Sequence, residues 1–118
     1  MKSRVLIVED DALLGLDIAA QLTDAGFEVI GPAVSVEKAL GLLRAAGCDV
    51  ALLDVNLGKE TSEPVARELR ALSKPFVVLS GYSSEQHPTE FRGAPLLSKP
   101  ARPSELVALL QHCAAKRN

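Results

Sequence analysis

Acidic side chains stand directly after two apolar runs of the sequence. Glu9, Asp10 and Asp11 follow the first run, and Asp54 follows another with Asn56 two places on. Gathered carboxylates repel one another and resist burial unless a cation neutralises them. Mg²⁺ suits oxygen ligands and commonly uses one or two carboxylates while keeping several waters. We therefore predict a magnesium site with Asp10 and Asp54 as direct ligands, Glu9 acting through water and the Asn56 carbonyl as a further ligand.

Asp54 is also a candidate nucleophile. It ends an apolar run, where an acid without a role would cost several kcal/mol if desolvated. Beside a metal ion its carboxylate could attack a phosphoryl donor and form an acyl phosphate. The transferred group carries negative charge that a cation and hydrogen-bond donors must stabilise. Lys99 offers the cation and Ser80 a hydroxyl, so the pattern predicts phosphoryl transfer to Asp54.

Each of these groups also has an ordinary structural interpretation. Acids favour the positive end of a helix dipole, and we expect that role for Asp11. An acid such as Asp54 in a loop just past a strand is common, and a Ser-Gly pair at Ser80 or a Lys-Pro pair at Lys99 means little alone. Useful groups at four separate strand ends indicate a site more strongly than any one of them.

Five short apolar runs, each followed by a segment of helical period, position these groups. Uninterrupted runs are typical of parallel strands buried on both faces. The predicted strands are Val5–Val8, Phe27–Ile30, Val50–Leu53, Phe76–Leu79 and Pro95–Leu97. Alternating strands and helices favour an α/β fold, a mainly parallel sheet with right-handed crossovers and helices on both faces. Ligands bind such sheets at the carboxyl ends of the strands, where the strand order reverses.

Helix signals follow each strand. The predicted helices cover about 13–25, 35–47, 64–72, 83–92 and 103–114, with 55–61 as a loop. Ser35 suits an N-cap and Pro64 a first turn, whereas Gly31-Pro32 should close the second strand. Residues 83–92 hold serines, a proline and few apolar side chains, so this fourth helix should be short or mobile.

Composition narrows the class of protein. The 118 residues suit one domain spanning 1–118, and 47% hydrophobic against 3% aromatic residues predicts an aliphatic core. A net charge of −2 without a basic stripe argues against nucleic acid as a partner. No stretch resembles a signal peptide or membrane span. Cys48 and Cys113, without metal-site spacing, are expected as free buried thiols, so we expect a cytoplasmic domain. No linker interrupts the alternation of strands and helices, so we expect no output domain.

Four motifs, in order along the chain, resemble the receiver domain of two-component response regulators. They are Glu9-Asp10-Asp11, Asp54-Val-Asn56, Ser80-Gly81 and Ser98-Lys99-Pro100. The resemblance implies a flavodoxin-like (βα)5 fold, a doubly wound five-stranded sheet of order 2-1-3-4-5. It implies phosphorylation of Asp54 with Mg²⁺ by a histidine kinase, a phosphotransfer protein or small phosphodonors. It also implies a cis peptide bond before Pro100.

Val78-Leu-Ser-Gly-Tyr82 is similar to the stretch that names the FATGUY subgroup, whose members are commonly stand-alone receivers working with HWE-type sensor kinases. One position departs from the wider family, in which an aromatic residue three places before the lysine reports phosphorylation. Leu96 stands there. We predict that Tyr82 and ordering of the segment 83–92 replace it as the switch.

Three functions fit the sequence to different degrees. The leading one is a phosphoacceptor response regulator that acts through protein binding or as a phosphate sink, and catalyses at most its own phosphorylation and dephosphorylation. A pseudo-receiver that binds partners without phosphorylation is the alternative. A haloacid-dehalogenase-type phosphatase needs a second acid two residues after its nucleophile, where this chain has Asn56.

Overall fold

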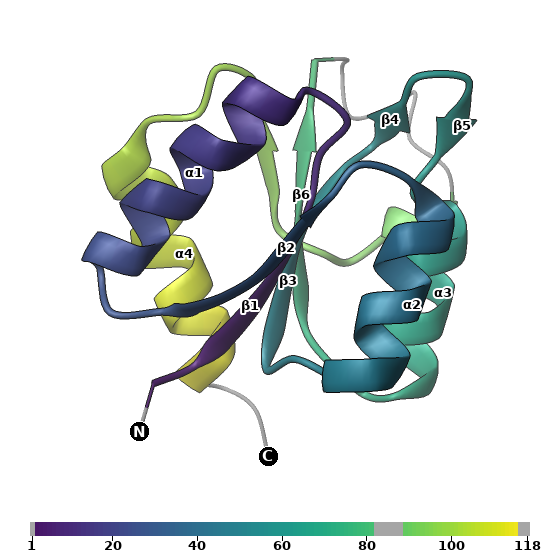
Figure 1. Cartoon of the computed structure of the whole chain (residues 1–118), viewed down its shortest axis with the longest axis horizontal. Coiled ribbons are helices and arrows are strands. Elements are labelled where there is room, and N and C mark those ends of the chain that lie inside the picture. Colours follow the sequence, from purple (N-terminus) through teal and green to yellow (C-terminus); the bar gives the residue numbers. More distant parts are fainter. Residues whose placement is uncertain (1, 82–88, 116–118) are drawn as a thin grey trace.

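A parallel sheet of five strands runs through the centre of the molecule (Figure 1). The structure is a computed structural model and describes residues 2–81 and 89–115. Its strands are β1 (Arg4–Val8), β2 (Glu28–Ala33), β3 (Val50–Asp54), β6 (Phe76–Ser80) and β7 (Leu96–Ser98). They lie in the order β2-β1-β3-β6-β7, and each neighbouring pair is parallel. The predicted doubly wound sheet of order 2-1-3-4-5 is confirmed.

Two helices cover each face of this sheet (Figure 1). The helices α1 (Ala12–Asp24) and α4 (Pro103–Ala115) lie on one face, and α2 (Val36–Ala46) and α3 (Glu63–Ala71) lie on the other. Every residue of β3 is buried, because helices cover both of its faces. None of the helices in the described ranges 2–81 and 89–115 is long and apolar enough to cross a membrane.

The residues of the central strand divide between two apolar layers. Leu53 packs in the layer beneath α2 and α3, and Leu52 packs in the layer beneath α1 and α4. Successive side chains of a strand point to opposite faces, so the apolar run of β3 supplies both layers in turn. Leucine, valine, isoleucine and alanine form most of both layers, as the composition predicted.

Local signals set the helix ends. The Asp11 carboxylate accepts a hydrogen bond of 3.1 Å from the Leu14 backbone N–H, and the Ser35 hydroxyl accepts one of 3.2 Å from that of Lys38. These N-caps satisfy donors that the first turn of a helix leaves free. Gly47, with a φ of 73°, ends α2. The sequence predicted that Asp11 favours the positive end of the helix dipole, and the structure places it at that end as the N-cap of α1.

The second strand differs from its predicted extent. It continues through Gly31-Pro32 to Ala33 instead of closing there, and its register to β1 shifts between Leu6 and Val8. Because β2 is an edge strand, Pro32 removes no hydrogen bond that a central strand would need. An irregular edge strand tolerates the turn signal that would interrupt a central one.

Residues 55–61 form a small hairpin where the sequence predicted a loop. The antiparallel strands β4 (Asn56–Leu57) and β5 (Glu60–Thr61) flank Gly58, whose φ is 71°. Glycine adopts this left-handed conformation readily, as tight two-residue hairpin turns require. The glutamate side chain of Glu60 accepts a 3.1 Å hydrogen bond from the Val36 backbone N–H, which ties the hairpin to the start of α2.

The segment between β6 and β7 is described only in its second half. Of the predicted fourth helix at 83–92, residues 83–88 lie outside the described residues, as does Tyr82. Residues Thr89–Phe91 form a single 3₁₀ turn, η2.

The third helix, α3, also ends one residue earlier than its apolar stripe predicted. Leu72 is 46% exposed because the chain leaves the helix there and Ser73 adopts a φ of 57°.

Neither Cys48 nor Cys113 forms a disulfide and both are buried, and burial raises the pKa of Cys48 to about 11. The thiolate is the reactive form, and at pH 8 only about one thousandth of such a thiol is ionised. In a Cys113→Ala variant, Cys48 should therefore resist a disulfide reagent such as 5,5′-dithiobis(2-nitrobenzoic acid) until the chain is unfolded in denaturant. Equal labelling rates for native and unfolded protein would contradict this burial.

Candidate metal and phosphoryl site

Three carboxylates meet at the carboxyl ends of β1 and β3. Glu9, Asp10 and Asp54 each place an oxygen within 4.8 Å of the others. Glu9 and Asp54 are 1% and 5% exposed, whereas Asp10 is open to solvent. The strands are parallel neighbours with Val8 opposite Leu53, so the acid that follows each strand reaches the same level. The register of two central strands therefore builds the acidic cluster.

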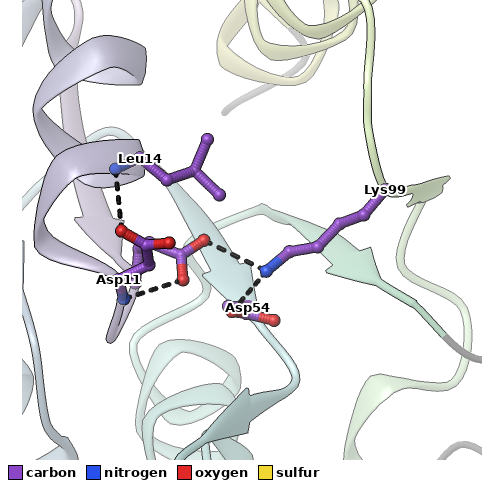
Figure 2. A network of polar contacts seen from close by, with 5 residues as sticks. Asp11, Leu14, Asp54 and Lys99 are labelled. Atoms are coloured by element: carbon purple, nitrogen blue, oxygen red, sulfur yellow. Dashed lines mark hydrogen bonds and ion pairs between the residues drawn. The ribbon is translucent and has the colours of Figure 1, made fainter.

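Lys99, which directly follows the edge strand β7, completes the site. Its ammonium donates a 2.7 Å hydrogen bond to Asp54 Oδ2 (Figure 2). It also lies 3.2 Å from Glu9 Oε1. The side chain starts after β7 and must pass β6 to reach Asp54 on β3, which suits the long stem of lysine. The Lys99 backbone N–H donates to the Ser80 carbonyl oxygen at 2.9 Å, and the Lys99–Pro100 peptide bond is cis.

The charges of the cluster do not balance. Burial raises the pKa of Glu9 to about 7, and the neighbouring carboxyl group of Asp54 adds to that shift. Burial acts to lower the pKa of Lys99, but the hydrogen bond and charge of Asp54, with the charge of Glu9, raise it overall. One ammonium faces three carboxyl groups, so Lys99 alone cannot neutralise the cluster.

One buried oxygen also lacks a hydrogen bond. Among the described side chains, Glu9 Oε1 is inaccessible and has no hydrogen-bond partner. Its 3.2 Å approach to Lys99 is an ion pair without hydrogen-bond geometry. The other oxygen, Oε2, accepts a 3.2 Å hydrogen bond from the Asp11 backbone N–H, which orients the carboxylate. A free buried oxygen among hard oxygen donors fits a site for Mg²⁺, directly or through water.

The remaining predicted residues lie around this cluster. Ser80, 1% exposed, ends β6 between β3 and β7, and Asn56 is half-buried in β4, two residues after Asp54. Leu96 opens β7, partly buried against the layer beneath α2 and α3. Tyr82 lies outside the described residues, so its predicted role as a switch stays a prediction.

A close contact beside Glu9 escaped the sequence reasoning. A Cβ atom at Gly15 of α1 would lie 3.1 Å from Pro32 Cβ and 3.7 Å from Glu9 Cβ. The absent side chain lets α1 approach the end of β2 and closes the protein around Glu9. An isolated glycine in an otherwise helical pattern is the signal that could have indicated such a contact.

The sequence matches the response regulator receiver domain family over residues 5–111. The chain belongs to this family. Receiver domains are modules of two-component signalling and not classical enzymes, and they generally bind Mg²⁺ at an acidic pocket. In this receiver Glu9, Asp10 and Asp54 form an acidic cluster that could hold a metal ion.

Known proteins resemble this receiver over nearly all of its length. Transcriptional regulatory protein PdtaR of Mycobacterium tuberculosis is 30% identical over 112 residues, which are 92% of this chain and 55% of PdtaR. The chain thus spans about half the length of this curated relative. A response regulator receiver protein from Sinorhizobium medicae has a TM-score of 0.87 at 27% identity, with coverage of 99% and 98% of the two chains.

A CheY-like receiver domain protein from Methanospirillum hungatei superimposes with a TM-score of 0.89 at 21% identity. The match covers 99% of this chain and 97% of that chain. An identity this low supports the shared fold alone.

Proposed function

We propose that this receiver domain accepts a phosphoryl group on Asp54 in two-component phosphorelay signalling. The observation that carries the proposal is the 2.7 Å contact between Lys99 Nζ and Asp54 Oδ2 at the edge of a buried acidic cluster. Lys99 is placed to pair with a new anion that forms on this carboxylate. In this proposal Asp10, Asp54 and the Asn56 carbonyl hold Mg²⁺, and Glu9 acts through water.

The proposed transfer uses the protein's own groups at each step. A carboxylate oxygen of Asp54 attacks the phosphorus of the donor. The bond from phosphorus to the donor breaks, the donor leaves with the electron pair, and an acyl phosphate remains on Asp54. The Lys99 ammonium shifts its pairing to a phosphoryl oxygen, and the Ser80 hydroxyl donates to another. Bound Mg²⁺ would supply further positive charge for these oxygens.

Partners of this site follow from the same proposal. The donor would be a cytoplasmic phosphotransfer protein or a sensor histidine kinase such as one of the HWE type. The phosphorylated domain would act on a downstream protein or serve as a phosphate sink. None of these roles requires contact with nucleic acid or membrane.

Intact-mass measurement after incubation with acetyl phosphate and Mg²⁺ tests this proposal. The unmodified protein should gain one phosphoryl group and Asp54→Ala none. Asp24→Ala, which removes an acid at the far end of α1, should gain one like the unmodified protein. Equal gain in Asp54→Ala would place the acceptor elsewhere. No gain in the unmodified protein, with Mg²⁺ binding intact, would instead favour an interaction module that works without phosphorylation.

A further inference from the structure

We infer that Arg70 is a positioning residue, which fixes the chain in front of β7 so that Lys99 reaches Asp54. The inference rests on the proposed phosphoryl transfer to Asp54, and it concerns a residue of α3 far along the chain from Lys99. Arg70 touches neither the acidic cluster nor the ammonium in the contacts described here. It acts through the segment that leads into β7.

Arg70 holds this segment with two hydrogen bonds. Its Nε donates to the Glu90 carbonyl oxygen at 3.0 Å, and its Nη2 donates to the Arg92 carbonyl oxygen. The guanidinium carbon also lies 5.2 Å from the centre of the Phe76 ring at the start of β6. The planar fork of arginine can donate twice while it stacks on an aromatic ring, and the single ammonium of lysine cannot reproduce that arrangement.

A second side chain of α3 holds the same turn. Arg67 Nη2 lies 3.5 Å from Glu90 Oε2, and a side-chain hydrogen bond with Glu63 lowers the pKa of Glu90. Exposed ion pairs of this kind contribute little energy alone. Together with the bonds of Arg70 they fix where η2 lies on α3. Phe91 in the same turn is 4% exposed and packs in the layer beneath α2 and α3.

The strand that carries Lys99 needs this support. β7 has only three residues, none of them fully buried, and it lies at the edge of the sheet. The described backbone bonds around its ends join the Val78 N–H to the Pro95 carbonyl and the Lys99 N–H to that of Ser80, each at 2.9 Å. β7 pairs with β6 over only three residues, so its placement also depends on the chain that enters it, and Arg70 holds that chain.

A small displacement of β7 would move the ammonium out of place. Lys99 Nζ is already extended past β6 to reach Asp54 and Glu9. Misplacement of a reacting group by about 1 Å can cost about a hundredfold in rate. The three carboxylates stand at the carboxyl ends of β1 and β3, on the other side of β6, so a shift of β7 should leave them in place.

Beryllofluoride, an analogue of the phosphoryl group, separates these two parts of the site in a binding titration with Mg²⁺ present. Arg70→Gln and Arg70→Lys should both weaken beryllofluoride binding by roughly tenfold and slow phosphorylation by acetyl phosphate, through misplaced Lys99. Mg²⁺ affinity should not weaken, because the carboxylates stay in place and a displaced ammonium competes less with the ion. Arg44→Gln on α2, an exposed arginine, is the matched control and should match the unmodified protein in all three measurements.

A double variant decides whether Arg70 acts through Lys99. If it does, Arg70→Gln should weaken beryllofluoride binding no further in a Lys99→Ala background. Equal additional weakening there, or Arg70 variants that bind as tightly as the unmodified protein, would overturn the inference while Lys99→Ala still shows its own loss. An unmodified protein that binds no beryllofluoride and gains no phosphoryl group would overturn the proposed function, and this inference with it.

Discussion

Lys99→Ala is expected to destabilise the metal-free protein by about 3 kcal/mol at pH 8, because it leaves buried carboxylates without their ammonium. Asp54 and Glu9 are 5% and 1% exposed, so solvent cannot replace the lost partner. The value is at the lower end for a broken buried pair, since 29% of the Lys99 side chain is exposed. Urea unfolding of the two proteins in a metal chelator measures the difference.

Mg²⁺ should recover much of the stability that Lys99→Ala loses, because the ion supplies positive charge to the same acids. Phosphorylation should not recover with it, since the ammonium would still be missing beside Asp54. Lys38→Ala, an exposed lysine on α2, serves as the control and should unfold like the unmodified protein. Identical unfolding free energies for Lys99→Ala and the unmodified protein would show that the ammonium does not hold the acids together.

Leu53→Ala is expected to cost about 2–5 kcal/mol of stability, because it removes a buried side chain from the central strand and leaves a cavity. Leu53 is 0% exposed and directly precedes Asp54, in the layer beneath α2 and α3. The matched variant Leu13→Ala removes the same atoms from a side chain that is 81% exposed on α1.

Leu13→Ala should change stability by no more than about 0.5 kcal/mol. Thermal and urea unfolding of both variants against the unmodified protein measure the contrast. A loss from Leu13→Ala as large as that from Leu53→Ala would mean that the exposed leucine is covered in solution by a contact that the isolated chain does not show.

The central strands and the acids that follow them could be predicted from the sequence because their signals are strong and local. A strand covered on both faces leaves an uninterrupted apolar run, and the acid that ends the run stands out, as Asp54 does after Val50–Leu53. The order of the strands came from the family resemblance. Once the first and third strands are parallel neighbours, the acids that follow them, Glu9 and Asp54, lie at the same level.

The missed features depend on contacts that no local pattern shows. The hairpin of β4 and β5 has strands of only two residues, too short for an alternating pattern to appear. The strand β2 continues through Pro32 because it lies at an edge, and the local Gly31-Pro32 turn signal does not carry that information. Arg70 looks like an ordinary exposed helix residue, and its partners are backbone carbonyls some 20 residues away.

The division of β3 between two apolar layers has a consequence for how this domain can change over time. Leu52 and Leu53 are neighbours in the chain, yet they belong to different clusters on opposite sides of the sheet. Substitutions without shared contacts combine nearly additively, so mutations in one layer should rarely need compensation in the other. Each layer can accumulate substitutions together with its own contact partners. Only at the strand ends, where both layers meet the acids, must substitutions in the two layers remain compatible with each other.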